Sequence, residues 1–422
     1  MHSLAASFRQ TRLAAALALA AFLWPGIATA ADPIKIGCSM ALTGGVAAIG
    51  KQVLAALQIW KDDVNAKGGL LGRQIELVYY DDQSNPSNVP PIYTKLIEVD
   101  KVDLLIGPYA TNMVAPAIPV VMQHNMTTIG ILANAANSKF HYKRYFSMLT
   151  SGPEPQKSFS TGFFELAMQH KSDLKTVAII GADAEFAQNA IDGARENLKG
   201  LPFTVVFDRS YPPTTTDYTP IMRAVQAATP DIVYAAAYPP DSVGIVRAAN
   251  EIGLTPKLFG GTFIGLIITA VKVQLGPMIN GIVNNESFLP APAFLTPEVT
   301  AMLTKYREIA PKEGIDPLGN AFPPFGYSAG QVLAEAVTQT NSLDQDKIAD
   351  YIHSHTFHTL LGDIAFGPDG EWSKSRALFT QFQHVTKGDI DEFRDTTHEV
   401  IVWPDQYKSG EMIYPYSVAK KP

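Results

Sequence analysis

Thr111 and Asn112 have the residue types and the position that favour binding a small anion. They follow an apolar run at residues 102–106 that ends at Gly107-Pro108, and they precede a predicted helix at residues 113–124. A hydroxyl or amide here caps the helix, and the free N–H groups and the dipole of a helix start attract an anion. The pattern predicts a receptor for a small carboxylate. An ordinary capped helix in an α/β domain would show the same residues.

A buried strand must hold this turn in place. The run at residues 102–106 is short and apolar, which is typical of a central strand in a parallel sheet. Pro108 cannot donate to a ladder of hydrogen bonds, so we expect the strand to end at Gly107-Pro108. The turn then lies at the carboxyl end of a strand, where open α/β sheets bind their ligands.

Predicted strands and helices alternate along the whole chain. The predicted strands lie at residues 34–40, 74–80, 102–106, 126–132, 176–180, 203–208, 231–235 and near Leu258. The pattern restarts after the linker-like Gly152-Pro153-Glu154-Pro155, and such alternation is typical of doubly wound parallel sheets. The sequence therefore predicts two α/β lobes that face a shared cleft. The loops expected to line it are residues 42–50, 107–112, 133–137, 181–185, 237–241 and 260–263.

The N-terminal residues have the pattern of an export signal. Arg9 and Arg12 precede an apolar run at residues 13–27, and Ala28-Thr29-Ala30 supplies the small residues that a signal peptidase needs. The run is too short for a stable membrane span. We expect a signal peptide over residues 1–30, cleavage near Ala30, a location in the periplasm and no direct membrane insertion.

The charge and the cysteine count exclude several kinds of partner. The chain holds 33 basic and 40 acidic residues, a formal net charge of -7. Loss of Arg9 and Arg12 brings it to about −9, which argues against nucleic acid as a partner. Cys38 is the single cysteine, so no intrachain disulfide can form. We expect no cofactor and no metal site.

One pattern favours an enzyme. Gly326-Tyr327-Ser328-Ala329-Gly330 fits the nucleophile elbow of α/β hydrolases, which requires a buried strand just before the serine. Consecutive prolines at 323 and 324 cannot belong to a central strand. The alternative is an exported serine hydrolase using Ser328. Acidic residues and histidines that could complete a catalytic triad do follow Ser328 in the sequence. They are Asp344, Asp363, His355 and His384. Otherwise Ser328 simply opens a helix at residues 329–340.

Two further patterns resemble functional sites but lack residues that such sites need. Residues 45–51 fit the spacing of a phosphate-binding loop, but Gln52 stands where a hydroxyl should hold magnesium. The histidines at 353, 355 and 358 do not share one helix face, and no acidic partner lies at helical spacing. We interpret the first as a coincidence and the second as surface histidines.

Several segments together resemble the periplasmic leucine/isoleucine/valine-binding proteins of ABC transporters. They are Ile34-Lys35-Ile36-Gly37, Leu42-Thr43-Gly44, residues 64–73 (VNAKGGLLGR), Tyr80-Asp81-Asp82, Leu105-Ile106-Gly107-Pro108, Thr359-Leu360-Leu361-Gly362 and residues 366–370 (FGPDG). The resemblance implies the type I periplasmic binding fold, with two lobes joined by three crossovers that close like a hinge. The implied divisions are lobe one at 31–152 and 287–373, and lobe two at 153–286 and 374–422.

The resemblance also implies a set of ligand contacts. The family's carboxylate-binding hydroxyl falls on Thr111, its second anchor on Ala133 and Asn134, and its two aromatics of lobe two on Phe186 and Tyr238. Its acidic partner for the ligand ammonium falls on Thr262. The full predicted contact set is Ile49, Tyr109, Thr111, Asn112, Ala133, Asn134, Phe186, Tyr238 and Thr262.

A threonine at the position of the acid changes the expected ligand. Burying an ammonium without a counter-charge costs several kcal/mol. Either Asp183, Glu185 or Asp241 replaces the missing acid, or the ligand is an aromatic or aliphatic carboxylate without an amine. The function implied is the substrate-binding component of an ABC importer for amino acids or related compounds, with a membrane permease as partner and no catalytic residue.

Overall fold

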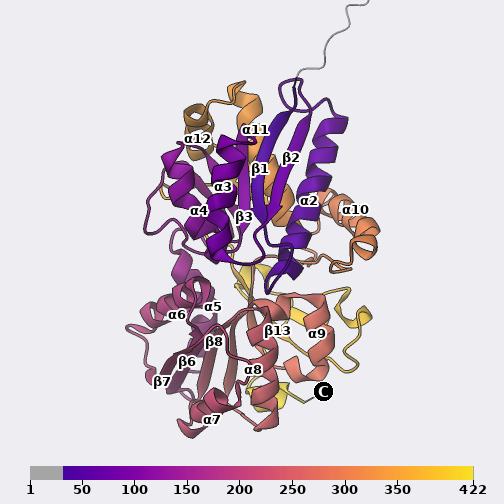
Figure 1. The fold of residues 1–422 in the computed structure, drawn as a ribbon. Helices are drawn as coiled ribbons and strands as arrows, with labels where there is room; N and C mark the ends of the chain where they lie inside the picture. Colours follow the sequence, from indigo (N-terminus) through magenta and orange to yellow (C-terminus); the bar gives the residue numbers. More distant parts are fainter. Residues whose placement is uncertain (1–31, 422) are drawn as a thin grey trace, which may run out of the picture. The chain divides into compact units, whose positions relative to one another are not determined.

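Two sheets with mainly parallel strands, each built from successive βα units, organise residues 32–421, which the computed structural model describes (Figure 1). The predicted signal peptide lies outside the described residues. The prediction of two doubly wound α/β lobes is confirmed. Among residues 32–421, no helix has the length and apolar character needed to cross a membrane.

The sheet of lobe one has five parallel strands in the order β2-β1-β3-β4-β5. Its strands are β1 (Ile34–Met40), β2 (Ile75–Asp81), β3 (Leu104–Tyr109), β4 (Thr128–Ile131) and β5 (Tyr145–Met148). The connecting helices are α2 (Ala47–Ala66), α3 (Val89–Glu98) and α4 (Thr111–Gln123). Helices α3 and α4 pack together against one side of β3, and α2 packs in a separate core with residues of β1 and β3.

The sheet of lobe two has seven strands in the order β14-β13-β10-β9-β8-β6-β7. Its strands are β6 (Thr176–Ala182), β7 (Thr204–Tyr211), β8 (Ile232–Ala237), β9 (Leu258–Phe263), β10 (Val283–Glu286), β13 (Leu378–Phe382) and β14 (Glu399–Trp403). Strands β13 and β14 are antiparallel additions to a parallel sheet. Its helices are α5 (Pro155–Gln169), α6 (Glu185–Leu198), α7 (Thr219–Ala227), α8 (Pro239–Glu251), α9 (Thr269–Leu275) and α13 (Tyr416–Ala419).

The chain passes between the two sheets three times. It enters lobe two after β5, leaves it after β10 and returns to it before β13. The elements between β10 and β13 pack on the core of lobe one. They are α10 (Pro297–Glu313), α11 (Pro323–Thr340), α12 (Gln345–Ser354), β11 (Thr356–Thr359) and β12 (Gly362–Ala365). Short 3-10 helices η1 to η5 cover Pro86–Asn88, Ile264–Ile267, Gly276–Ile279, Asp391–Phe393 and Asp405–Tyr407.

The core of lobe one depends on close packing of α2 against α11. Val53, Leu57 and Trp60 of α2 are all buried, as their spacing at i, i+4 and i+7 indicates. A Cβ added at Gly330 of α11 would lie 2.2 Å from the Trp60 indole. Glycine is therefore required at this helix contact.

Several predicted boundaries were wrong, and two of them affect the candidate site. Strand β3 does not end at Gly107-Pro108 but continues to Tyr109, because a register shift against β4 lets the Gly-Pro pair lie within the strand. Strand β9 continues through Gly260 and Gly261 to Phe263, so the predicted loop at residues 260–263 is part of the sheet. The edge strand β5 was not predicted.

Candidate functional site

The strand order places one crevice in each sheet. In both lobes the first parallel strand lies between the second and the third, as β2-β1-β3 and as β7-β6-β8. Connections leave neighbouring strands in opposite directions at such a point, which opens a crevice at the carboxyl ends. Residues at or just after the carboxyl ends of these strands line a common cavity. They are Tyr109 to Thr111 in lobe one and Phe186 and Tyr238 in lobe two.

We call this space the inner cavity. It measures about 50 Å³, enough for a few water molecules at roughly 10–15 Å³ each. Of its lining residues, only Tyr109, Thr111, Tyr238, Asn285 and Ser287 have polar side chains, and none has a charged one. The complete lining is Val46, Tyr109, Ala110, Thr111, Leu132, Leu149, Phe159, Phe186, Tyr238, Pro239, Ile264, Ile267, Asn285, Ser287 and Phe322.

Thr111 contributes a buried hydroxyl to this cavity. Ala110 turns the chain with a φ of 76° and precedes the helix, so α4 begins at Thr111 itself. The predicted role of Thr111 as a cap is therefore wrong. Its Oγ1 instead accepts a hydrogen bond of 2.8 Å from the Asn134 N–H, which leaves the hydroxyl proton free to donate. The first N–H groups of α4 have no intrahelical acceptor, so the position suits a carboxylate.

Asn112 joins the two lobes. Its Oδ1 accepts hydrogen bonds from the Tyr238 hydroxyl at 2.8 Å and from the Phe186 N–H at 3.1 Å. Asn189 Nδ2 of lobe two also donates to the Asn134 carbonyl oxygen of lobe one at 3.0 Å. Through these bonds the described chain adopts a conformation in which the lobes are closed over the inner cavity.

Three aromatic rings of lobe two form one wall of the cavity. Phe186 meets Tyr238 at 5.4 Å between ring centroids and Phe159 at 5.6 Å, and both pairs have edge-to-face geometry. Burial raises the pKa of the Tyr238 phenol above its usual value, so its hydroxyl remains a donor at neutral pH. Such a wall suits an apolar or aromatic ligand body.

The three acids considered as ammonium partners all lie outside the inner cavity. Asp241 accepts hydrogen bonds from the Tyr218 hydroxyl at 2.9 Å and the Tyr211 hydroxyl at 3.0 Å. It lines an adjoining outer cavity of about 210 Å³, which shares Val46, Ala110 and Tyr238 with the inner one. Glu185 pairs with Lys139 of lobe one at 3.1 Å, and Asp183 accepts from Gln188 Nε2 at 3.2 Å.

Five predicted contact residues do not line the inner cavity: Asn112, which lines the outer cavity, and four that are buried elsewhere. Ile49 is fully buried in the core of lobe one. Ala133 and Asn134 are buried beside Thr111, where the Ala133 carbonyl accepts from the Ser147 hydroxyl and the Asn134 side-chain amide has no partner among the described residues. Thr262 lies within β9, and its hydroxyl donates to the Phe159 carbonyl oxygen at 3.0 Å.

The predicted contact set missed the polar lining residues Asn285 and Ser287. They flank Glu286, where the chain was predicted to cross back into lobe one, but no strand was predicted there. It also missed Ile264 and Ile267 of η2, because β9 was expected to end earlier. Recognising the short strand that precedes the second crossover, β10, could have indicated Asn285 and Ser287.

The nucleophile-elbow geometry is not formed at Ser328. This residue lies inside α11, which begins at Pro323, so no strand precedes it and it does not open the helix. Its hydroxyl is fully buried and has no partner among the described residues. Of the predicted triad partners, Asp363 pairs with His358 and Asp344 caps α12.

Two doubly wound lobes that close over a cavity at the ends of their strands define a two-lobe ligand-binding protein. Residues 33–386 match the family described as "Periplasmic binding protein". The chain belongs to the periplasmic binding protein family. This membership confirms the resemblance to periplasmic binding proteins found in the sequence.

Named relatives agree with this family. The chain is 25% identical over 365 residues to the "Leucine-, isoleucine-, valine-, threonine-, and alanine-binding protein" of Pseudomonas aeruginosa, covering 86% of this chain and 93% of that one. Its fold is similar to that of the branched-chain amino acid transporter substrate binding protein LivJ of Streptococcus pneumoniae in complex with isoleucine. The TM-score is 0.71 at 20% identity, over 88% of this chain and 100% of that one.

A second solved structure has a different ligand. It is an ABC transporter solute binding protein from R. palustris in complex with 4-hydroxybenzoate. The TM-score is 0.72 at 18% identity, over 84% of this chain and 94% of that one. At these identities the two structures support the fold alone.

Proposed function

We propose that the inner cavity binds the carboxylate of a small ligand, with Thr111 and the N-terminus of α4 as the anion receptor. Thr111 is 1% exposed and lines the cavity beside Tyr109 and Tyr238. A hydroxyl, a phenol and the free N–H groups of a helix start supply donors but no opposing negative charge. This combination favours an anionic group over a cationic one.

The ligand we propose is an aromatic or aliphatic carboxylate without an ammonium group. The observation that supports this class is the absence of any charged side chain among the residues that line the inner cavity. An ammonium buried there would lack a counter-charge, at a cost of several kcal/mol. The edge-to-face rings of Phe159, Phe186 and Tyr238 offer an apolar wall for the ligand body. The R. palustris protein in complex with 4-hydroxybenzoate has the same fold.

A branched-chain amino acid is the second candidate. The names of the curated relatives favour it. In that case the ammonium would extend past Tyr238 to Asp241, which lines the outer cavity. Asp241 is 5% exposed and already accepts two phenol hydroxyl hydrogen bonds.

Either ligand requires the lobes to open. A cavity of about 50 Å³ is smaller than the roughly 150 Å³ cavity that holds a benzene molecule. We infer that ligand enters an open form and that closure forms the Asn112 bonds to Phe186 and Tyr238 around an enlarged cavity. The closed form then presents residues of both lobes to a membrane permease.

The remaining assignments follow from this role. We infer an exported, periplasmic protein that binds and releases its ligand without catalysis. Lobe one then comprises residues 31–152 and 287–373, and lobe two comprises residues 153–286 and 374–422. The sheet contents support this division, since β1 to β5 form one sheet and β6 to β10 with β13 and β14 form the other.

A thermal-shift panel on ligand-stripped protein tests the proposed ligand class. It compares benzoate, 4-hydroxybenzoate and short branched acids with leucine, isoleucine and valine. A ligand at about a thousand times its dissociation constant adds roughly 4 kcal/mol to stability. We expect stabilisation by the amine-free acids. Stabilisation by amino acids alone, lost in Asp241→Asn, would establish the second candidate instead.

A further inference from the structure

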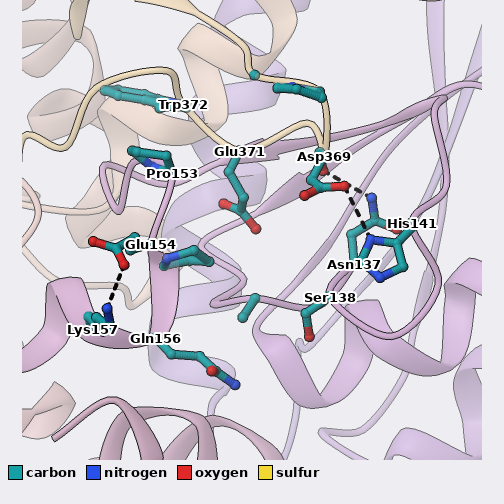
Figure 2. A pocket seen from close by; sticks show the side chains of 14 residues that line it. Asn137, Ser138, His141, Pro153, Glu154, Gln156, Lys157, Asp369, Glu371 and Trp372 are labelled. Carbon is teal, nitrogen blue, oxygen red and sulfur yellow. Dashed lines mark hydrogen bonds and ion pairs between the residues drawn. The ribbon is translucent and has the colours of Figure 1, made fainter. Parts of the chain in front are cut away.

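A second cavity, here called the side cavity, lies beside the first and third crossovers (Figure 2). Its volume is about 330 Å³, within the size range of small-molecule sites. It shares no lining residue with the inner cavity. Its walls come from the loop after β4, the start of α5 and the segment at residues 367–372.

Glu371 is the buried carboxylate of this cavity. Only 6% of the residue is exposed. One carboxylate oxygen accepts a hydrogen bond of 3.3 Å from the Ser151 hydroxyl, and the other has no partner among the described residues. Figure 2 shows the carboxylate directed toward the middle of the cavity, between the Glu154 and Asp369 walls.

The other two carboxylates of the cavity already have side-chain partners. Glu154 pairs with Lys157 at 2.6 Å, and Asp369 pairs with His141 at 3.2 Å. Among the described residues, Glu371 makes no ion pair. The nearby Arg376 guanidinium lies over the Trp372 ring, 5.0 Å from its centroid.

Burial, with a contribution from the Asp369 carboxylate, raises the pKa of Glu371 to about 8. An unpaired buried carboxyl of this kind is costly, because desolvation disfavours its charged form. A positively charged donor in the cavity would reverse that cost by pairing with the ionised carboxylate.

The rest of the lining indicates what kind of cation fits. Pro153, Pro155, Pro368 and Trp372 supply apolar walls around the carboxylate. Among the described residues, no three His, Cys, Asp or Glu side chains gather to hold a metal ion. A cavity much larger than an ion, with one unpaired carboxylate beside an apolar side formed by the prolines and Trp372, suits an organic molecule with a single charged end.

We propose that the side cavity binds a small alkylammonium compound, whose ammonium group donates a hydrogen bond to Glu371 and whose alkyl body packs against the prolines and Trp372. The bound cation replaces the missing partner of the carboxylate. This site is separate from the carboxylate site in the inner cavity, and the two proposals can fail independently.

Calorimetric titration of the protein with cyclohexylammonium tests the proposal. We expect one site per chain and no binding of cyclohexanol, which has the same body without the charge. Glu371→Gln should weaken binding at least tenfold. The matched control Glu298→Gln, at an exposed position on α10, should not change it.

The pH dependence provides a readout that does not depend on a variant. The ammonium binds the ionised carboxylate, and the ionised fraction rises about tenfold between about pH 7 and pH 9 for a group with a pKa near 8. The affinity for cyclohexylammonium should therefore rise about tenfold over the same pH range. Absence of cyclohexylammonium binding to the parent protein would mean that the cavity holds only water. Equal binding by Glu371→Gln, or no increase with pH, would also overturn the proposal.

Discussion

The Tyr238 hydroxyl of lobe two donates a hydrogen bond of 2.8 Å to Asn112 Oδ1 of lobe one. The same oxygen accepts from the Phe186 N–H. Asn112 thus contacts two of the three aromatic residues of the cavity wall, and it stands next to Thr111, the proposed receptor for the ligand carboxylate. Closure of the lobes and formation of the site therefore depend on the same turn at the start of α4.

Asn112→Ala should weaken ligand binding by favouring the open form. The substitution removes both acceptor contacts across the lobes, and each hydrogen bond contributes roughly 0.5–1.5 kcal/mol. We expect a loss of about five- to a hundredfold in affinity by calorimetry, together with a larger radius of gyration in solution scattering. Asn250→Ala, at an exposed position on α8, is the matched control. An unchanged affinity in Asn112→Ala would show that these bonds do not stabilise the closed form.

Thr111→Val should impair both stability and binding. The valine keeps the shape of the side chain but leaves the buried Asn134 N–H without its acceptor, at a cost of about 1–3 kcal/mol in unfolding free energy. It also removes the proposed donor to the ligand carboxylate, so affinity should fall about tenfold or more. Thr111→Ser should retain both the acceptor for the Asn134 N–H and the donor to the ligand carboxylate. Equal affinities of the Val and Ser variants would contradict the proposed role of the hydroxyl.

Glu371 should make the protein less stable as the pH rises. Its pKa is about 8 in the folded chain and 4.5 ordinarily, so the folded state holds a proton that the unfolded state has already lost. Stability from this group is complete below about pH 4.5 and decreases up to about pH 8, by at most about 1.4 kcal/mol per pH unit. Urea unfolding of Glu371→Gln should show a shallower decline over this window than the parent. Identical slopes would contradict the shifted pKa.

Lys272→Met should destabilise lobe two strongly. Lys272 Nζ lies 2.7 Å from Glu399 Oε2, and each side chain is 4% exposed. Removing the lysine leaves an uncompensated buried carboxylate, at a cost of about 3–5 kcal/mol in unfolding free energy. The double variant Lys272→Met, Glu399→Gln should recover part of this loss. A single variant as stable as the parent would show that the pair adds nothing.

The sequence predicted the parts of the fold that rest on local patterns. Short apolar strands and their alternation with helices were sufficient to predict two α/β lobes and the loops at the carboxyl ends of the strands. Tyr109, Thr111, Asn112 and Tyr238 lie in those loops and line the inner or outer cavity. Phe186, which the family resemblance implied, lines the inner cavity.

The failures come from interactions that a single sequence does not reveal. Gly260 and Gly261 resemble a strand end, yet pairing with β8 and β10 carries the strand on to Phe263, so Thr262 faces Phe159 instead of the cavity. Asn285 and Ser287 reach the site only because the chain crosses between lobes there. Tertiary pairing overrides the local signal in both cases.

Calorimetric titration of the ligand-stripped protein with 4-methylpentanoate and with leucine tests the central claim most directly. The two compounds share a carbon skeleton and differ by the ammonium group. Because no charged side chain lines the inner cavity, we expect 4-methylpentanoate to bind at least about tenfold more tightly, a difference of about 1.4 kcal/mol. Tight binding of leucine, with none of 4-methylpentanoate, would contradict the account.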